Sequence, residues 1–139
     1  GGTAIFTDPK TAVKCGGAPQ KIMYLAEESF RKQGVRDQSR VLFMNAKPTN
    51  FTAPAYGVTL RRLCEQRGID INLEHDLIEL RPEAKEAVFR RGDGSELVVR
   101  YDLIHVTPPQ SSPDFIKRSP LANADGWVEV DKHTLAHVR

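Results

Sequence analysis

A cysteine in a glycine-rich turn is the residue of this sequence best suited to chemistry. Cys15 lies in residues 14–21 (KCGGAPQK), between an expected strand at residues 3–7 and an expected helix at residues 21–32. Dinucleotide folds hold phosphate at such a turn, through backbone N–H groups at the helix N-terminus. The same N-terminus, with the two lysines of the turn, stabilises a thiolate. Because the G-x-G-x-x-G spacing is missing, the turn favours sulfur chemistry over nucleotide binding; a buried structural cysteine is the alternative.

Two other residues have side chains that could take part in a reaction. His105 falls in an expected central strand at residues 102–106, near the sheet edge where open α/β sheets bind ligands. Its side chain is suited to proton transfer, and a core histidine bonded to backbone is the alternative. Cys64 lies four residues after Leu60 on the apolar face of an expected helix, which predicts a structural role. No Cys or His stands at ligand spacing from either cysteine, so no metal site is expected.

Composition limits the class of protein. The 139 residues are 40% apolar and 27% charged, which predicts one globular domain over residues 1–139. The net charge is only +2 and the basic residues are dispersed, so no nucleic-acid partner is expected. No segment approaches the ~20 apolar residues of a membrane span, and no signal peptide opens the chain.

The elements that must position Cys15 and His105 follow a βαβαβ pattern. Strands are expected at residues 3–7, 41–44 and 71–73, and the apolar run at 41–44 fits a strand buried on both faces. Two helices are expected between these strands, at residues 21–32 and from about residue 52 to residue 68. Residues placed on the inward faces of these helices are Ile22, Leu25, Ala26, Ser29, Tyr56, Leu60, Leu63 and Cys64.

The second half of the chain is expected to interrupt and then resume this sheet. Three short strands at residues 77–80, 87–89 and 97–101, with a glycine-rich turn at 91–95, predict an antiparallel meander. The chain then returns through residues 102–106 and leaves the sheet at two prolines. A surface loop at residues 110–126 and a last strand at residues 127–131 are expected. The fold class is therefore α/β: a Rossmann-like, three-layer domain with a central parallel sheet and an inserted antiparallel β-meander.

Three ordered motifs resemble one family. The turn at residues 14–21 with the following IMYLAE, the segment IHVTPP at residues 104–109, and GWVEVDK at residues 126–132 are similar to segments of sulfide:quinone oxidoreductases, most of all the mitochondrial type and its bacterial relatives. These are flavoproteins related to the pyridine nucleotide-disulfide oxidoreductases. The resemblance runs over essentially the whole chain.

The resemblance implies that the chain is an excised part, the second dinucleotide-binding-like domain of a two-domain flavoprotein. The FAD-binding motifs of the family are absent here, so FAD is expected on the FAD-binding domain of the same polypeptide and not on this chain. In the family, electrons pass from sulfide to a cysteine pair, then to FAD, then to quinone. The resemblance implies that Cys15 is one member of that pair and that Gly16, Gly17 and Pro108 face the flavin. It implies a longer protein that lies peripherally on the bacterial cytoplasmic membrane or the mitochondrial inner membrane.

NAD binding is not expected. An NAD site needs the glycine fingerprint after the first strand and an acidic residue near the end of the second strand. The first is missing, and the second strand ends in Asn45, Ala46 and Lys47. Two other functions stay open: a domain of an NAD(P)H-dependent disulfide or quinone reductase, and a non-catalytic binding module.

Overall fold

The computed structural model describes residues 1–139 and divides them into two compact units, residues 1–109 and residues 110–139. That residues 1–139 act as one dinucleotide-binding-like domain stays a prediction.

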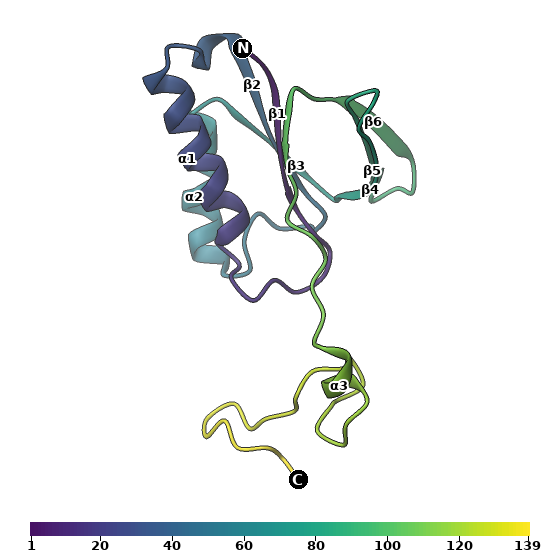
Figure 1. The fold of residues 1–139 in the computed structure, drawn as a ribbon. Helices are drawn as coiled ribbons and strands as arrows, with labels where there is room; N and C mark the ends of the chain where they lie inside the picture. Colours follow the sequence, from purple (N-terminus) through teal and green to yellow (C-terminus); the bar gives the residue numbers. More distant parts are fainter. The chain divides into compact units, whose positions relative to one another are not determined.

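The first unit is built around a four-stranded parallel sheet (Figure 1). The strands run in the order β3-β2-β1-β7, so β1, the first strand of the chain, is central. Their bounds are β1 Gly2–Asp8, β2 Ser39–Asn45, β3 Ile69–Leu73 and β7 Leu103–His105. The connecting helices are α1 Ala18–Lys32, the 3₁₀ turn η1 Arg36–Gln38 and α2 Pro54–Gln66.

A second, antiparallel sheet is inserted between β3 and β7. It consists of β4 His75–Arg81, β5 Glu86–Arg91 and β6 Glu96–Arg100. The hairpin between β5 and β6 closes with a hydrogen bond from Arg91 N to Ser95 O (2.8 Å), and Gly94 supplies the positive φ of 85° that this turn requires. The predicted meander is confirmed.

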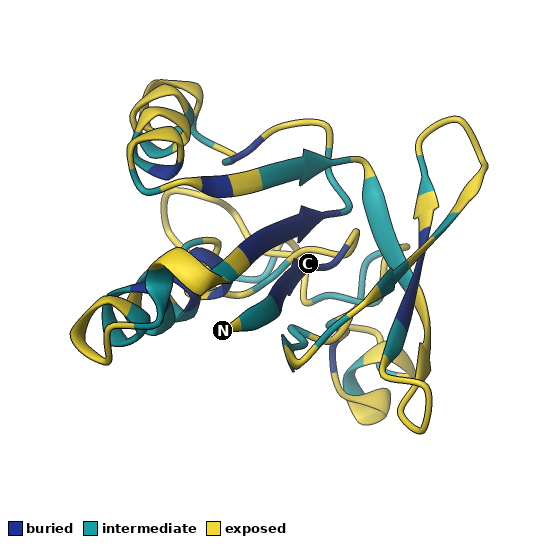
Figure 2. Ribbon diagram, turned by 90° about the horizontal axis from the view of Figure 1, so that it is seen from above, coloured by how far each residue is buried: buried dark blue, intermediate teal, exposed yellow.

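The parallel sheet is buried on both faces, as the apolar run in its second strand predicts. Alternate residues of each strand point to opposite faces. Ala4, Phe6, Val41, Phe43 and Ile69 pack with Met23 of α1 and Cys64 of α2, whereas Ile5, Leu42 and Met44 pack with Ala87 and Phe89 of β5. Both helices thus cover one face and the meander covers the other, which confirms the three-layer α/β fold; Figure 2 shows the buried strands between these layers.

The inward face of each helix differs in part from the expectation. Leu25 and Tyr56 are 61% and 67% exposed, while Leu60 and Leu63 are half-buried. In α1 the buried residues are Pro19, Gln20, Met23 and Glu27, which also recur at helical spacing. The expectation was wrong for Leu25 because two positions of the buried stripe of α1, Gln20 and Glu27, are polar, so apolar spacing indicates the wrong face. It was also wrong for Tyr56, which lies in the first turn of α2, where no residue is buried.

The second unit contains little regular structure. The loop expected at residues 110–126 includes a single helical turn, α3 Asp114–Lys117. The strand expected at residues 127–131 does not form; two isolated bridges, Ala122 with Val128 and Val130 with His137, stand in its place. The segment is bounded by two turns, in which Asn123 Oδ1 accepts a hydrogen bond from Trp127 N and Asp131 Oδ1 accepts one from Thr134 N.

Candidate functional site

Cys15 lies in the turn between β1 and α1, as the sequence predicts. The residue is exposed, its carbonyl accepts a hydrogen bond from Ala18 N (2.8 Å), and Gly17 is the N-cap of α1. Pro19 in the first helical turn has no N–H to donate. The turn therefore holds the thiol next to the helix N-terminus and open to solvent.

The two glycines after Cys15 have different surroundings. A Cβ placed on Gly16 would lie 3.8 Å from Cε2 of Phe51, whereas a Cβ on Gly17 would meet nothing within 4 Å. Gly17 has φ −89°, which any residue adopts. The backbone conformation does not demand glycine at position 17, so the open space beside it is what the missing side chain provides.

The carboxyl ends of β1 and β2 are closed by an internal polar cluster. Lys47 Nζ lies 2.6 Å from Asp8 Oδ1, and Asp8 is buried. Asn45 accepts a hydrogen bond from Lys47 N (2.8 Å) and donates one to Thr49 O (3.0 Å). The position where a dinucleotide site needs an acidic residue therefore holds an amide whose side chain is already bonded within its own loop.

His105 ends β7 at this same edge of the sheet, since β1, β2 and β7 run parallel. Its ring stacks on Phe6 of β1, with centroids 6.2 Å apart, and its Nδ1 is buried without a hydrogen-bond partner. The backbone-bonded histidine that the sequence left as an alternative is not what the structure shows. No hydrogen bond connects His105 to Cys15.

Pro108 follows β7 and is exposed. The segment is tied to β1 by a hydrogen bond from Thr107 N to Thr7 Oγ1 (3.0 Å). The structure thus brings Cys15, Gly16, Gly17, His105 and Pro108 to the carboxyl edge of the parallel sheet, on two separate connections.

Cys64 is fully buried and its sulfur lies 3.1 Å from the Tyr24 hydroxyl. Burial raises the pKa of the Cys64 thiol, although the Tyr24 hydrogen bond opposes this. Burial and the Cys64 contact also raise the pKa of Tyr24. A buried protonated thiol is a poor nucleophile, so the predicted structural role of Cys64 fits its surroundings.

A polar chain that the sequence pattern did not reveal joins the first turns of α1 to the loop before α2. Tyr24 donates to Gln20 Oε1 (3.3 Å), and Gln20 Nε2 donates to Asn50 O (2.6 Å). Gln20 and Asn50 are both buried, and Asn50 Nδ2 has no partner. Nothing in the local sequence pattern marks these residues, since both are polar and lie 30 positions apart.

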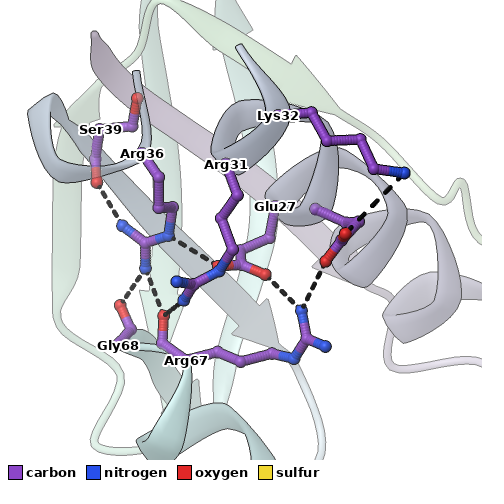
Figure 3. A network of polar contacts seen from close by, with 8 residues as sticks. Glu27, Arg31, Lys32, Arg36, Ser39, Arg67 and Gly68 are labelled. Carbon is purple, nitrogen blue, oxygen red and sulfur yellow. Dashed lines mark hydrogen bonds and ion pairs between the residues drawn. The ribbon is translucent and has the colours of Figure 1, made fainter. Parts of the chain in front are cut away.

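An ion cluster fixes the other end of α1 (Figure 3). Glu27, which is 0% exposed, accepts hydrogen bonds from Arg31 Nε (2.5 Å), Arg36 Nε (3.0 Å) and Arg67 Nη1 (2.6 Å). Arg36 also donates to the carbonyls of Arg67 and Gly68 after α2. Burial alone would raise the pKa of Glu27, but the three arginines outweigh it and hold that pKa below its ordinary value. The cluster joins α1 to the end of α2.

The structure was also compared with the requirements of a metal site and of a membrane span. It contains no group of three or more His, Cys, Asp or Glu side chains that could hold a metal ion. None of its helices has the length and apolar character needed to cross a membrane.

Comparison with known proteins identifies homologues of the whole chain. The chain is 49% identical over 138 residues to a mitochondrial sulfide:quinone oxidoreductase of Mus musculus, covering 98% of the chain and 31% of that protein. It is 46% identical over 140 residues to the Dictyostelium discoideum protein of the same name, covering 100% of the chain and 31% of that protein. No protein-family model matches. The chain is homologous to a segment of these oxidoreductases, which confirms the resemblance, and it spans about a third of their length.

Two solved structures share the fold. The sulfide:quinone oxidoreductase of Aquifex aeolicus superimposes with a TM-score of 0.73 at 19% identity, over 91% of this chain and 30% of that one. A chain in the mitochondrial ATP synthase of Tetrahymena thermophila superimposes with a TM-score of 0.78 at 18% identity, over 99% of this chain and 34% of that one. At these identities the likeness concerns the fold alone.

Proposed function

We propose, from this homology, that the chain is the cysteine-bearing domain of a longer oxidoreductase of the sulfide:quinone type. The observation that carries the proposal is the contrast between the two cysteines. Cys15 is exposed at the carboxyl edge of a parallel sheet, where such folds act on ligands, while Cys64 is sealed in the core. Sulfide and quinone, for which the relatives are named, are the proposed substrates of the longer protein.

The proposed task of Cys15 is to be one half of a redox disulfide. Attack by hydrosulfide on such a disulfide breaks the S–S bond, leaving one sulfur as a persulfide and the other as a thiolate. The disulfide takes up the two electrons of the sulfide sulfur in this step. The partner cysteine has to come from outside this chain, because Cys64 is buried against Tyr24.

The residues of this chain do not form a cradle for FAD. Gly17 has open space in place of a close backbone approach, Pro19 removes one N–H from the helix start, and Asn45 is bonded within its own loop. We therefore place FAD, which would accept the electron pair, on another domain of the longer protein. Gly16, Gly17 and Pro108 are the proposed surface toward that flavin, because they lie at the same sheet edge as Cys15.

His105 is proposed to move protons at this edge. Its buried Nδ1 has no hydrogen-bond partner in this chain, so no bond at that atom fixes which ring nitrogen carries the proton. The stacking on Phe6 fixes the ring plane.

Two other functions make different predictions. A domain of an NAD(P)H-dependent reductase has to bind the nucleotide, and the closed loop of Asn45 disfavours this. A non-catalytic module would leave the thiol of Cys15 without effect on any turnover. The relatives are named as mitochondrial proteins. The longer protein is proposed to sit peripherally on a membrane, the mitochondrial inner membrane or the bacterial cytoplasmic membrane.

The test uses a longer protein that contains this segment. Cys15→Ser is expected to leave bound flavin unchanged, measured by its visible absorbance, and to lower sulfide-dependent quinone reduction by orders of magnitude. Cys64→Ser is the matched control and should lose some thermal stability and little activity. Near-normal turnover of the Cys15→Ser protein would refute the proposed role.

A further inference from the structure

The last strand of the meander, β6, has one edge that pairs with no other strand. The antiparallel sheet runs β4-β5-β6, so β6 is bonded to β5 alone (Figure 1). A hollow of about 340 Å³ borders β6, and its lining includes Val98, Arg100 and, from the parallel sheet, Leu42. Val98 is 47% exposed. The edge therefore opens onto free space, and such an edge is a surface to which a further strand can add.

The register of the β5–β6 ladder determines which backbone groups of β6 face outward. At one end of the ladder Tyr101 N donates to Lys85 O (2.9 Å), and at the other end Arg91 N donates to Ser95 O (2.8 Å). Hydrogen-bonded and non-bonded pairs alternate along an antiparallel ladder. The odd-numbered residues of β6 are therefore bonded to β5, and the backbone N–H and C=O groups that point away from β5 belong to residues 96, 98 and 100.

Two other sheet edges have features that prevent a further strand from pairing, and β6 has none of them. β4, the opposite edge of the meander, contains a register shift between Leu77 and Glu79. β7 has only three residues and is followed by two prolines. Bulges, short strands and prolines all disfavour strand addition. β6 pairs regularly over its five residues and contains neither proline nor glycine.

The sequence of β6, ELVVR, is complementary to itself in the antiparallel direction. When two copies of the strand are aligned about Val98, Glu96 of each copy lies opposite Arg100 of the other. The apolar residues 97 and 99 lie opposite each other in the same way. The side chains at 96, 98 and 100 share the outer face of the sheet, because those at 97 and 99 pack inward against the core. The aligned residues 96, 98 and 100 are also those whose backbone groups point outward.

The charged residues at the two ends of β6 are available for such pairs. Glu96 is exposed. Arg100 keeps 84% of its side chain exposed, and its ion pair with Glu86 spans 3.4 Å. Opposite charges directly across two antiparallel strands stabilise the pairing, whereas like charges destabilise it. A second copy of β6 therefore fits this edge in hydrogen bonding, apolar contact and charge.

We propose that two copies of this chain associate edge to edge through β6, about a two-fold axis at Val98. The two meanders then form one six-stranded antiparallel sheet, in which Val98 N–H of each copy donates to Val98 C=O of the other. Both β6 edges are used in this contact, and the outer edges that remain are the bulged β4 strands, so the assembly ends at the dimer. The contact does not involve Cys15, and its test does not depend on the proposed redox function.

The first test measures the monomer–dimer equilibrium of the 139-residue chain by sedimentation over a concentration series, under reducing conditions. Glu96→Arg and Arg100→Glu each place like charges opposite each other at both ends of the pairing. Each variant alone is expected to dimerise roughly fourfold more weakly or worse. An equimolar mixture of the two variants should form the dimer again, because every arginine then meets a glutamate. Glu83→Arg makes the same charge change in an exposed turn and should leave the equilibrium unchanged.

The second test detects the register of the pairing through a disulfide. Opposed residues of a hydrogen-bonded antiparallel pair have Cα atoms about 5.5 Å apart, which a disulfide can span. In a Cys15→Ser background, Val98→Cys should form a disulfide between two copies under mild oxidation, identified by peptide mass mapping. Val58→Cys, also exposed but on α2, should form one much more slowly. Circular dichroism melts confirm that each variant is folded.

Four results would overturn the proposal. They are a wild-type chain that stays monomeric at its highest soluble concentration, single charge variants that dimerise as the wild type does, a mixture of the two that stays monomeric, and equally fast disulfides at positions 58 and 98. Slow hydrogen exchange of the Val98 and Arg100 amides in the monomer of a longer protein that contains this segment would also overturn it, because another segment then covers the edge.

Discussion

Glu27→Gln tests whether the ion cluster holds α1 in place. Glutamine has nearly the same size as glutamate but carries no charge. Its amide NH₂ group would lie against the arginine guanidinium groups, which are themselves hydrogen-bond donors. Removing one partner of a buried ion pair costs about 3–5 kcal/mol. Arg31 and Arg67 keep 46% and 32% of their side chains exposed and can regain water, whereas Arg36 is only 12% exposed. We therefore expect a loss at the lower end, about 3 kcal/mol.

The assay is urea unfolding of the 139-residue chain, followed by far-UV circular dichroism. A loss of about 3 kcal/mol corresponds to a melting temperature lower by roughly 10 °C for a chain of this size. Glu28→Gln is the matched control, because Glu28 is half exposed and its closest ion pair, to Arg67, spans 3.5 Å; its effect should stay within about 0.5 kcal/mol. If Glu27→Gln also changes the free energy of unfolding by less than about 0.5 kcal/mol, the reasoning is refuted.

The same cluster sets a pH dependence. Because the folded pKa of Glu27 lies below its ordinary value, its contribution to stability is complete above the unfolded pKa, near 4.3. The contribution is lost as the pH falls through the lower folded pKa. Below about pH 4 the wild type should therefore lose unfolding free energy faster than Glu27→Gln, measured by urea unfolding across a pH series. Parallel curves for the two proteins would contradict this.

Three further predictions concern the two cysteines, the polar chain and nucleotides. A disulfide reagent should react quickly with one thiol per chain, Cys15, and with Cys64 only in denaturant; two fast thiols would contradict the burial of Cys64. Gln20→Leu should cost about 1–3 kcal/mol in urea unfolding, because it strips Asn50 O of its donor, whereas Gln33→Leu at an exposed position should cost under about 0.5 kcal/mol. Calorimetric titration should find neither FAD nor NAD(H) bound to the isolated chain at micromolar affinity, since the Gly17 turn and the Asn45 loop offer no phosphate cradle; micromolar binding of either refutes this.

Hydrophobic pattern was sufficient to predict the parallel sheet and its connections. The run at residues 41–44 is apolar throughout, as a strand covered on both faces must be, and β2 is buried there. The position of Cys15 followed from the same order of strand, glycine-rich turn and helix. Turn chemistry identified the meander, because Gly94 and its neighbours permit a hairpin.

Long-range polar contacts could not be predicted in this way. Glu27 and Gln20 occupy the buried stripe of α1, where a polar residue is tolerated only because Arg36, Arg67 and Asn50 lie opposite it in the folded chain. These partners are 9 to 40 residues away in sequence. Leu25 and Tyr56 were expected to face inward because of their helical spacing, but both are exposed.

The central position of β1 has a consequence for folding. One of its neighbours in the sheet, β2, is the next strand along the chain, whereas the other, β7, comes from the end of the first unit, and Thr3 N bonds to Asp102, 99 residues away. A ribosome that adds about 5–20 residues per second needs roughly 5–20 s to supply that neighbour. During this time β1 can pair with β2 but keeps its other edge unpaired, as a template for a foreign strand. Early closure of the β4–β6 meander shortens the remaining loop and so lowers the entropy lost when β7 pairs with β1.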